Sequence, residues 1–171
     1  MKIRLEIVFL ILILLFGLFI RVYDLGAAPL WIDEATSAMA SKMILEKGVP
    51  VFDSGYAFDR ANIFHYMQAG IMGFGISDFS ARFISVIFGL LTILLGYFIG
   101  KEYSKSGGII VALFLSVFYL EVIFSRQARM YQLFQLMFFL SLYLLYKSRE
   151  KDWLIYPALV SLYITIDTQI A

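Results

Sequence analysis

The sequence has no cysteine, only one histidine and almost no net charge, and each shortage excludes a class of protein. Without cysteine there is no disulfide framework, no thiolate metal site and no cysteine nucleophile. A single histidine cannot form a zinc site by itself. Lys and Arg number 14 against 13 acidic residues, so the net charge of +1 gives no general reason to bind nucleic acid.

The short motifs of several enzyme classes are also missing. The chain has no glycine-rich phosphate loop, no HExxH and no GxSxG, so nucleotide hydrolysis, zinc proteolysis and serine hydrolysis have no support. Three prolines and twelve glycines are its few interruptions, and no solenoid repeat is visible. The sequence therefore predicts one domain covering residues 1–171.

Apolar residues dominate what is present. The chain of 171 residues is 61% hydrophobic, whereas soluble domains contain about 45–50% apolar residues. We expect an all-α bundle of transmembrane helices with five spans, because five apolar stretches approach the length that crosses a bilayer. They cover residues 3–23, 79–100, 107–124, 130–146 and 153–171. For the first stretch the alternative is a cleaved signal sequence.

Charges in the short loops predict the orientation. Lys101, Lys105, Lys147, Arg149 and Lys151 fall on the same side as the N-terminus, which carries Lys2 and Arg4. Since Lys and Arg mark cytoplasmic loops, we expect a multi-pass protein of the cell membrane with a cytoplasmic N-terminus.

The long loop 24–78 then faces the extracytoplasmic side. Residues 35–47 within it predict a helix along the membrane surface, with Gly48 and Pro50 as stop signals. Residues 63–76 predict a short interfacial or re-entrant helix.

Two adjacent carboxylates, Asp33 and Glu34, follow the first span and form the first candidate catalytic site. A carboxylate at the membrane surface could accept the proton of an attacking hydroxyl. The alternative is structural, with Asp33 as the N-cap of the 35–47 helix and Glu34 in its first turn. Capping and catalysis are compatible.

A second candidate site lies between the third and fourth stretches. Arg126 and Arg129 are three residues apart, would stack together on a helix, and could hold a phosphate group. The alternative is that both reach the lipid headgroups. The two arginines also run against the charge bias that predicts this side to be external.

Three further ionisable residues could take part. Glu121 and Asp167 lie within apolar stretches, where charged groups are usually functional. We expect Glu121 to reach water, because it lies about one turn from the outer boundary. His65 is expected to be packed or interfacial, although it could join carboxylates around a metal ion.

Three ordered motifs resemble those of the GT-C superfamily of membrane glycosyltransferases, in particular dolichyl-phosphate-mannose protein mannosyltransferases and bacterial aminoarabinose transferases. The motifs are residues 30–34 (LWIDE), 74–82 (FGISDFSAR) and 124–131 (FSRQARMY), and their order and spacing agree as well. The resemblance covers nearly the whole chain, as the N-terminal part of a longer enzyme.

The resemblance implies transfer of a sugar from a polyprenyl-phosphate donor to an acceptor hydroxyl on a protein or lipid, outside the cytoplasm and with inversion. Asp33 would then be the base and Glu34 its support. Arg126 and Arg129 would bind the donor phosphate, and Tyr131 would line that pocket. No cofactor is required from the sequence, and the need for a divalent metal is unknown.

The rival hypothesis is a non-catalytic membrane subunit or truncated remnant that binds the lipid-phosphate sugar. Family members are several-fold longer, and this chain stops within an apolar stretch, so a partner chain could supply the missing C-terminal part. A small transporter is a third, weaker alternative, because the charged residues gather at one face instead of the bilayer midplane.

Overall fold

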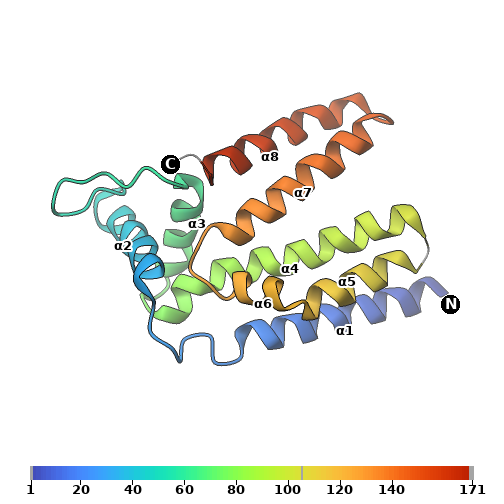
Figure 1. Ribbon diagram of the computed structural model, residues 1–171, viewed down its shortest axis with the longest axis horizontal. Helices are drawn as coiled ribbons and strands as arrows, with labels where there is room; N and C mark the ends of the chain where they lie inside the picture. Colours follow the sequence, from blue (N-terminus) through green and yellow to red (C-terminus); the bar gives the residue numbers. More distant parts are fainter. Residues whose placement is uncertain (1, 105, 170–171) are drawn as a thin grey trace.

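The computed structural model describes residues 2–104 and 106–169, and its regular structure is helical apart from one isolated bridge between Val51 and Ala57. The helices, shown in Figure 1, are α1 (Lys2–Val22), α2 (Ile32–Lys47), α3 (Asn62–Met72), α4 (Asp78–Tyr103), α5 (Gly107–Val117), α6 (Tyr119–Ser125), α7 (Tyr131–Ser148), a 3-10 turn η1 (Asp152–Leu154) and α8 (Ile155–Asp167).

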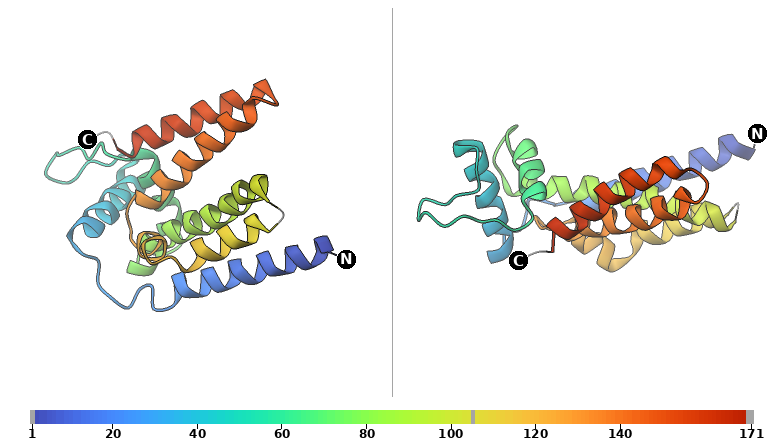
Figure 2. Two further views of the ribbon diagram at one scale, coloured as in Figure 1. Left: turned by 45° about the vertical axis from the view of Figure 1, so that its right-hand side comes forward. Right: turned by 90° about the horizontal axis from the view of Figure 1, so that it is seen from above.

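The long helices run side by side, and two shorter helices cross one end of them. Helix α4 contacts α1, α5 and α7, while α8 lies along α7. Helices α2 and α3 pack on each other and run across the bundle at the end opposite the N-terminus (Figures 1 and 2). The predicted all-α membrane bundle is confirmed, and we call the crossing pair α2 and α3 the platform.

The platform helices match the two predicted for the long loop, with shifted bounds. Helix α2 begins at Ile32, three residues before the predicted start, and ends at Lys47. Gly48 follows as its C-cap, and its φ of 79° is left-handed, as expected for a glycine stop. Helix α3 covers the first part of the predicted 63–76 segment.

The predicted spans differ in how well they meet the length and hydropathy needed to cross a membrane. Within the described residues, α1 and α4 meet both requirements, and α5 with α6 makes a third span if the bent pair counts as one. Helices α7 and α8 lie where the fourth and fifth stretches were expected, and the total of five spans stays a prediction.

The third predicted span, 107–124, was expected to be continuous and is broken. Helices α5 and α6 meet at an angle of 62°. Phe118 between them has an extended backbone, with φ −61° and ψ 125°. The Arg21 guanidinium accounts for the break, because it donates to the carbonyls of Leu115 and Ser116 at 3.1 and 3.0 Å, which α5 leaves free.

Glycines allow α4 and α5 to pack closely. A Cβ atom on Gly100 would lie 2.6 Å from the carbonyl oxygen of Gly107, and one on Gly108 would lie 2.7 Å from the carbonyl oxygen of Tyr97. Larger residues at either glycine would force the helices apart. Such small-residue contacts are typical of helices packed in membranes.

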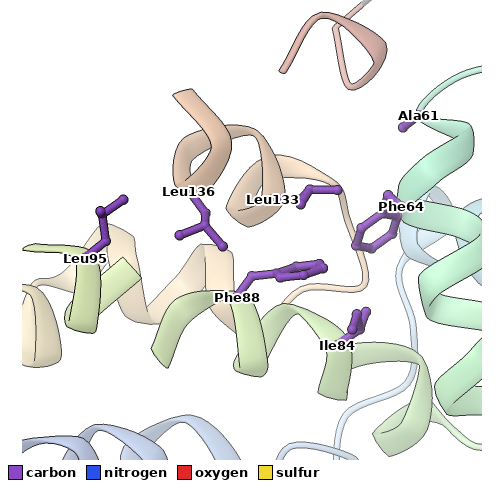
Figure 3. Packing of buried hydrophobic residues seen from close by; sticks show 7 residues of the cluster. All are labelled: Ala61, Phe64, Ile84, Phe88, Leu95, Leu133 and Leu136. Atoms are coloured by element: carbon purple, nitrogen blue, oxygen red, sulfur yellow. The ribbon is translucent and has the colours of Figure 1, made fainter. Parts of the chain in front are cut away.

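A buried apolar cluster joins the platform to the bundle (Figure 3). Phe64 of α3 packs with residues of α4 and α7, so burial of its ring holds α3 against both long helices. The cluster comprises Ala61, Phe64, Ile84, Phe88, Leu95, Leu133 and Leu136. The platform is therefore fixed to the bundle by packing from three elements.

Candidate active site

Glu34 lies at the centre of the contacts between the platform and the bundle. Its carboxylate accepts hydrogen bonds from Nε and Nη2 of Arg82, at 2.9 and 2.7 Å, and from the backbone N–H of Ala128 at 2.8 Å. The N–H of Trp31 donates at 3.3 Å. Burial by itself would raise the pKa of Glu34, but these donors outweigh it and hold the pKa below its usual range. Glu34 thus ties α2, α4 and the α6–α7 turn together.

Arg82 completes this junction and orders the connection from α1 to α2. Its guanidinium donates to the carbonyls of Leu25, Ala28 and Pro29 at 2.9, 2.8 and 3.2 Å. Sequence reasoning quoted Arg82 only as the end of a motif and gave it no role. The sequence feature that could have indicated a role for Arg82 is its charge near the start of an otherwise apolar span, where an arginine needs a partner.

Asp33 is half-buried in the first turn of α2. The prediction that it is the N-cap was wrong, because the helix begins at Ile32 and Trp31 is the residue before it. The side chain of Asp33 accepts no hydrogen bond within residues 2–104 and 106–169, in contrast to Glu34. The two adjacent carboxylates therefore differ, because, within the described residues, Glu34 is engaged by the bundle and Asp33 is not.

Arg129 lies against α2, beside Asp33. Its Nη1 donates to the carbonyl of Asp33 at 3.2 Å and to the hydroxyl of Ser37 at 3.0 Å. The guanidinium lies over the ring of Tyr131, 5.5 Å from the centroid. Its buried Nε has no partner in the described part of the chain. Arg129 thus lies between the backbone of Asp33 and the ring of Tyr131.

Arg126 reaches a different helix. Its Nη1 donates to the carbonyls of Ile20, Arg21 and Tyr23 at 2.7, 3.1 and 2.7 Å, and so caps the end of α1. The stacking of the two arginines expected for a helix does not occur, because residues 126–130 form a turn. Arg126 instead lines an open pocket of about 350 Å³. Its other lining residues include Trp31, Gln127, Glu34 and Arg82.

A comparison of the sequence with known families identifies the family of the chain. Residues 59–166 match the profile of the family described as dolichyl-phosphate-mannose-protein mannosyltransferase. The chain belongs to this mannosyltransferase family. The matched region contains Arg82, Arg126 and Arg129, whereas Asp33 and Glu34 precede it.

A comparison with curated proteins adds a more distant relative. An uncharacterized protein of Aquifex aeolicus (strain VF5) is 26% identical over 160 residues, which cover 88% of this chain and 32% of the relative. The chain therefore spans about a third of the length of the curated relative it matches. No solved structure matches the chain.

His65 of this family member is buried in the platform, next to the site. Only 1% of its surface is exposed, and Phe58 and Phe64 lie edge-on to its ring. Burial, and secondarily the charge of Arg129, lowers its pKa to about 4. Within the described residues no group of three His, Asp or Glu side chains is placed to hold a metal ion. The packed position was expected, and the need for a metal stays open.

The two acids of the apolar stretches both meet protein groups. Glu121 was expected to reach water, and this was wrong. It is 5% exposed and accepts hydrogen bonds from the side-chain amides of Gln132, at 3.2 Å, and Gln135. The bend between α5 and α6 turns it into the bundle. Asp167 accepts a hydrogen bond from the N–H of Ile63 at 3.2 Å, at the first turn of α3.

Arg21 was not singled out from the sequence. It is fully buried and, like Arg126, donates hydrogen bonds to free carbonyls at the end of a helix. It bonds the carbonyls at the end of α5, whereas Arg126 bonds those at the end of α1. Arg21 thus satisfies free carbonyls of α5, and Arg126 satisfies free carbonyls of α1, the helix that contains Arg21. The pair thereby fixes the α6–α7 turn, which carries Arg129 and leads into Tyr131, the first residue of α7.

Proposed function

We propose that this chain carries part of the active site of a glycosyltransferase that moves a sugar from a polyprenyl-phosphate donor to an acceptor hydroxyl on the extracytoplasmic side of the membrane. The observation that carries the proposal is the hydrogen bond from Arg129 to the backbone carbonyl of Asp33, which places the two residues next to each other at the start of α2. A carboxylate and a guanidinium at one end of a membrane bundle supply a base and an anion clamp side by side.

Asp33 is the general base of the proposed reaction. The acceptor oxygen forms a bond to the anomeric carbon, the bond from that carbon to the phosphate oxygen breaks, and the acceptor proton passes to the Asp33 carboxylate. Attack opposite the leaving phosphate inverts the anomeric centre. The unengaged carboxylate of Asp33 supports this role, since a base must be within hydrogen-bond reach of the proton it takes.

Arg126, Arg129 and Tyr131 are the proposed donor-phosphate site. Negative charge builds on the phosphate as the bond breaks, and guanidinium groups stabilise it most when they are fixed in advance. Within the described residues, both arginines donate their side-chain hydrogen bonds through a single terminal nitrogen, Nη1. Donor atoms therefore remain for a phosphate.

Glu34 has a positioning role in this proposal. Its carboxylate is engaged by Arg82 and Ala128, so it holds the first turn of α2 against the α6–α7 turn. This fixes Asp33 relative to Arg129, and small errors in such placement reduce rates strongly.

The test is Asp33→Asn in the full-length protein, purified and assayed with a radiolabelled polyprenyl-phosphate sugar. We expect a loss of transfer of at least about 100-fold, the lower end of general-base contributions, with unchanged membrane insertion and donor binding. Glu46→Gln is the matched control, because Glu46 is exposed on the same helix. Undiminished transfer by Asp33→Asn would remove Asp33 from the mechanism.

Donor binding is tested separately. Arg126→Ala and Arg129→Ala should each weaken binding of the polyprenyl-phosphate sugar by about 10-fold or more, as expected for a lost charge-assisted contact. Binding that is unaffected by both changes would place the phosphate elsewhere.

A further inference from the structure

The connection from α3 to α4 exposes large apolar side chains around a hollow. Phe74 is 94% exposed, and Ile76 and Phe79 are 59% and 40% exposed. Together with Ile71, Ser80 and Phe83 they line an open hollow of about 610 Å³. We call residues 74–76 the aromatic loop. Contiguous exposed apolar surface of this kind usually marks a contact with a membrane or a partner.

The polar groups in the wall of this hollow are already satisfied. The Ser77 hydroxyl accepts a hydrogen bond from the Ser80 N–H at 3.1 Å, and the Ser77 N–H donates to the Ser80 hydroxyl at 3.0 Å. The two serines cap α4. None of the lining residues is charged. A headgroup or a peptide backbone would therefore find few partners, whereas an aliphatic chain needs none.

The wall of the hollow continues onto a membrane-spanning helix. Phe79 and Phe83 occupy the first turns of α4, and their rings stack with centroids 5.3 Å apart. Helix α4 is long and apolar enough to cross the bilayer. The aromatic loop precedes its first residue, so it lies at the depth where interfacial aromatic residues gather.

We propose that the aromatic loop inserts into the leaflet next to the platform and that its hollow holds a hydrocarbon chain of a bilayer phospholipid. The continuity of the hollow with the start of α4 argues for lipid as the occupant. This inference is independent of the proposed function.

Insertion would set the depth of the candidate active site. The two platform helices are joined by buried hydrogen bonds, since the Ser41 hydroxyl donates to the Gln68 side chain at 2.6 Å and to the His65 carbonyl at 3.1 Å. The Gln68 amide in turn donates to the carbonyl of Ala81 in α4 at 2.7 Å. An anchored α3 therefore holds α2, and with it Asp33, at a fixed height above the hydrocarbon.

Because the sequence has no cysteine, a single introduced cysteine can be labelled specifically with a nitroxide. Phe74→Cys and Ile76→Cys, each with a nitroxide label, are placed in vesicles of phosphatidylcholine and phosphatidylglycerol. Leu15→Cys on the exposed face of α1 is the membrane control, and Ser54→Cys in the exposed 51–58 loop is the aqueous control. All four sites are surface positions, so folding should be retained.

We expect labels at 74 and 76 to collide more with oxygen than with a water-soluble nickel chelate, as the label at 15 does. The label at 54 should show the opposite preference. Labels at 74 and 76 that behave like the one at 54 would overturn the proposal.

A second measurement identifies the chain in the hollow. A fluorescent label at residue 76 should be quenched when the phosphatidylcholine carries brominated chains, and a small fraction of unbrominated polyprenyl phosphate should restore fluorescence only in proportion to its dilution of the bromine. A disproportionate recovery would overturn the assignment to bulk phospholipid and point to the isoprenoid.

Discussion

Glu34 and Arg82 form a buried ion pair, with side-chain exposures of 2% and 7%. Removing one charge of such a pair leaves the other without compensation in a dry environment, which costs about 3–5 kcal/mol. We therefore expect Glu34→Gln to lower the free energy of unfolding by about 3 kcal/mol, a loss measurable by unfolding in detergent.

The exposed pair of Lys42 and Glu46 on the same helix is the control for this prediction. Its two side chains are 47% and 49% exposed, and Glu46→Gln should change stability by less than about 0.5 kcal/mol. Adding Arg82→Met to Glu34→Gln should recover part of the loss, since the orphaned charge is gone. Equal effects at Glu34 and Glu46 would contradict the structural role of Glu34.

We expect the protein to lose stability in mild acid, because His65 is buried in its neutral form. Its pKa is lowered to about 4 in the folded protein from an ordinary value of 6.5, so the unfolded chain binds the proton more readily. Stability is therefore present above pH 6.5 and is lost as pH falls toward 4. We expect a loss of about 2 kcal/mol between pH 7 and pH 5.

The matched variant for the pH prediction is His65→Gln, which cannot titrate. Its stability should change little between pH 7 and pH 5, because the low pKa of Glu34 places the loss from that carboxyl further into the acid range. If the stability of the wild-type protein changes as little as that of the variant between pH 7 and pH 5, His65 is not the titrating group.

The family resemblance gave Asp33 and Glu34 different roles, but the local residue pattern could not tell which of the two carboxylates is buried. Adjacent residues on a helix point about 100° apart, so the phase of α2 decides which carboxylate is buried. That phase depends on Arg82, which lies 48 residues later and selects Glu34 as its partner. A contact across that separation is not visible in a local sequence pattern.

At the scale of elements, α4 passes close to α6 at Gly89. A Cβ atom there would lie 2.6 Å from the Cβ of Ser125 and 3.0 Å from Nε of Arg21. Gly89→Ala should therefore destabilise the protein by about 1–3 kcal/mol, as overpacking does. Thermal unfolding in detergent measures the change.

Gly70→Ala is the control, because it lies in α3 and a Cβ there meets nothing within 4 Å. That change should be neutral or stabilise by up to about 1 kcal/mol, since alanine favours a helix over glycine. Adding Ser125→Gly to Gly89→Ala should restore part of the stability. No recovery would mean that the contact with Arg21 dominates the cost.

The long apolar helices were predictable, and the break in the third was not. Residues 107–124 contain no proline and are apolar almost throughout, so the local sequence gives no reason for the helix to end within them. The break instead depends on Arg21, which binds the carbonyl of Ser116, 95 residues away in the chain. The same bend buries Glu121, which explains why its expected exposure was wrong.

At the scale of the whole molecule, the basic residues of the α7–α8 connection lie at the opposite end from Arg126 and Arg129. The platform and the α6–α7 turn lie at one end, and the N-terminus and the α7–α8 connection lie at the other (Figures 1 and 2). Lys147, Arg149 and Lys151 belong to the second end. Lys and Arg in short loops near a span favour the cytoplasmic side.

The two arginines that oppose this bias are engaged by protein groups. Arg126 bonds three backbone carbonyls, and Arg129 bonds the carbonyl of Asp33 and the hydroxyl of Ser37. Their charges serve the fold and the candidate site, and in the folded protein they are not free loop cations. The expected orientation, with the N-terminus cytoplasmic, stays a prediction.

Single cysteines test this orientation. Ser54→Cys lies in the exposed loop of the platform end, and Glu150→Cys lies in the exposed α7–α8 connection. In intact cells a membrane-impermeant maleimide should label residue 54 and leave residue 150 unlabelled until the membrane is permeabilised. The reverse pattern would put Asp33 in the cytoplasm, and the acceptor in the proposed reaction would then have to be cytoplasmic as well.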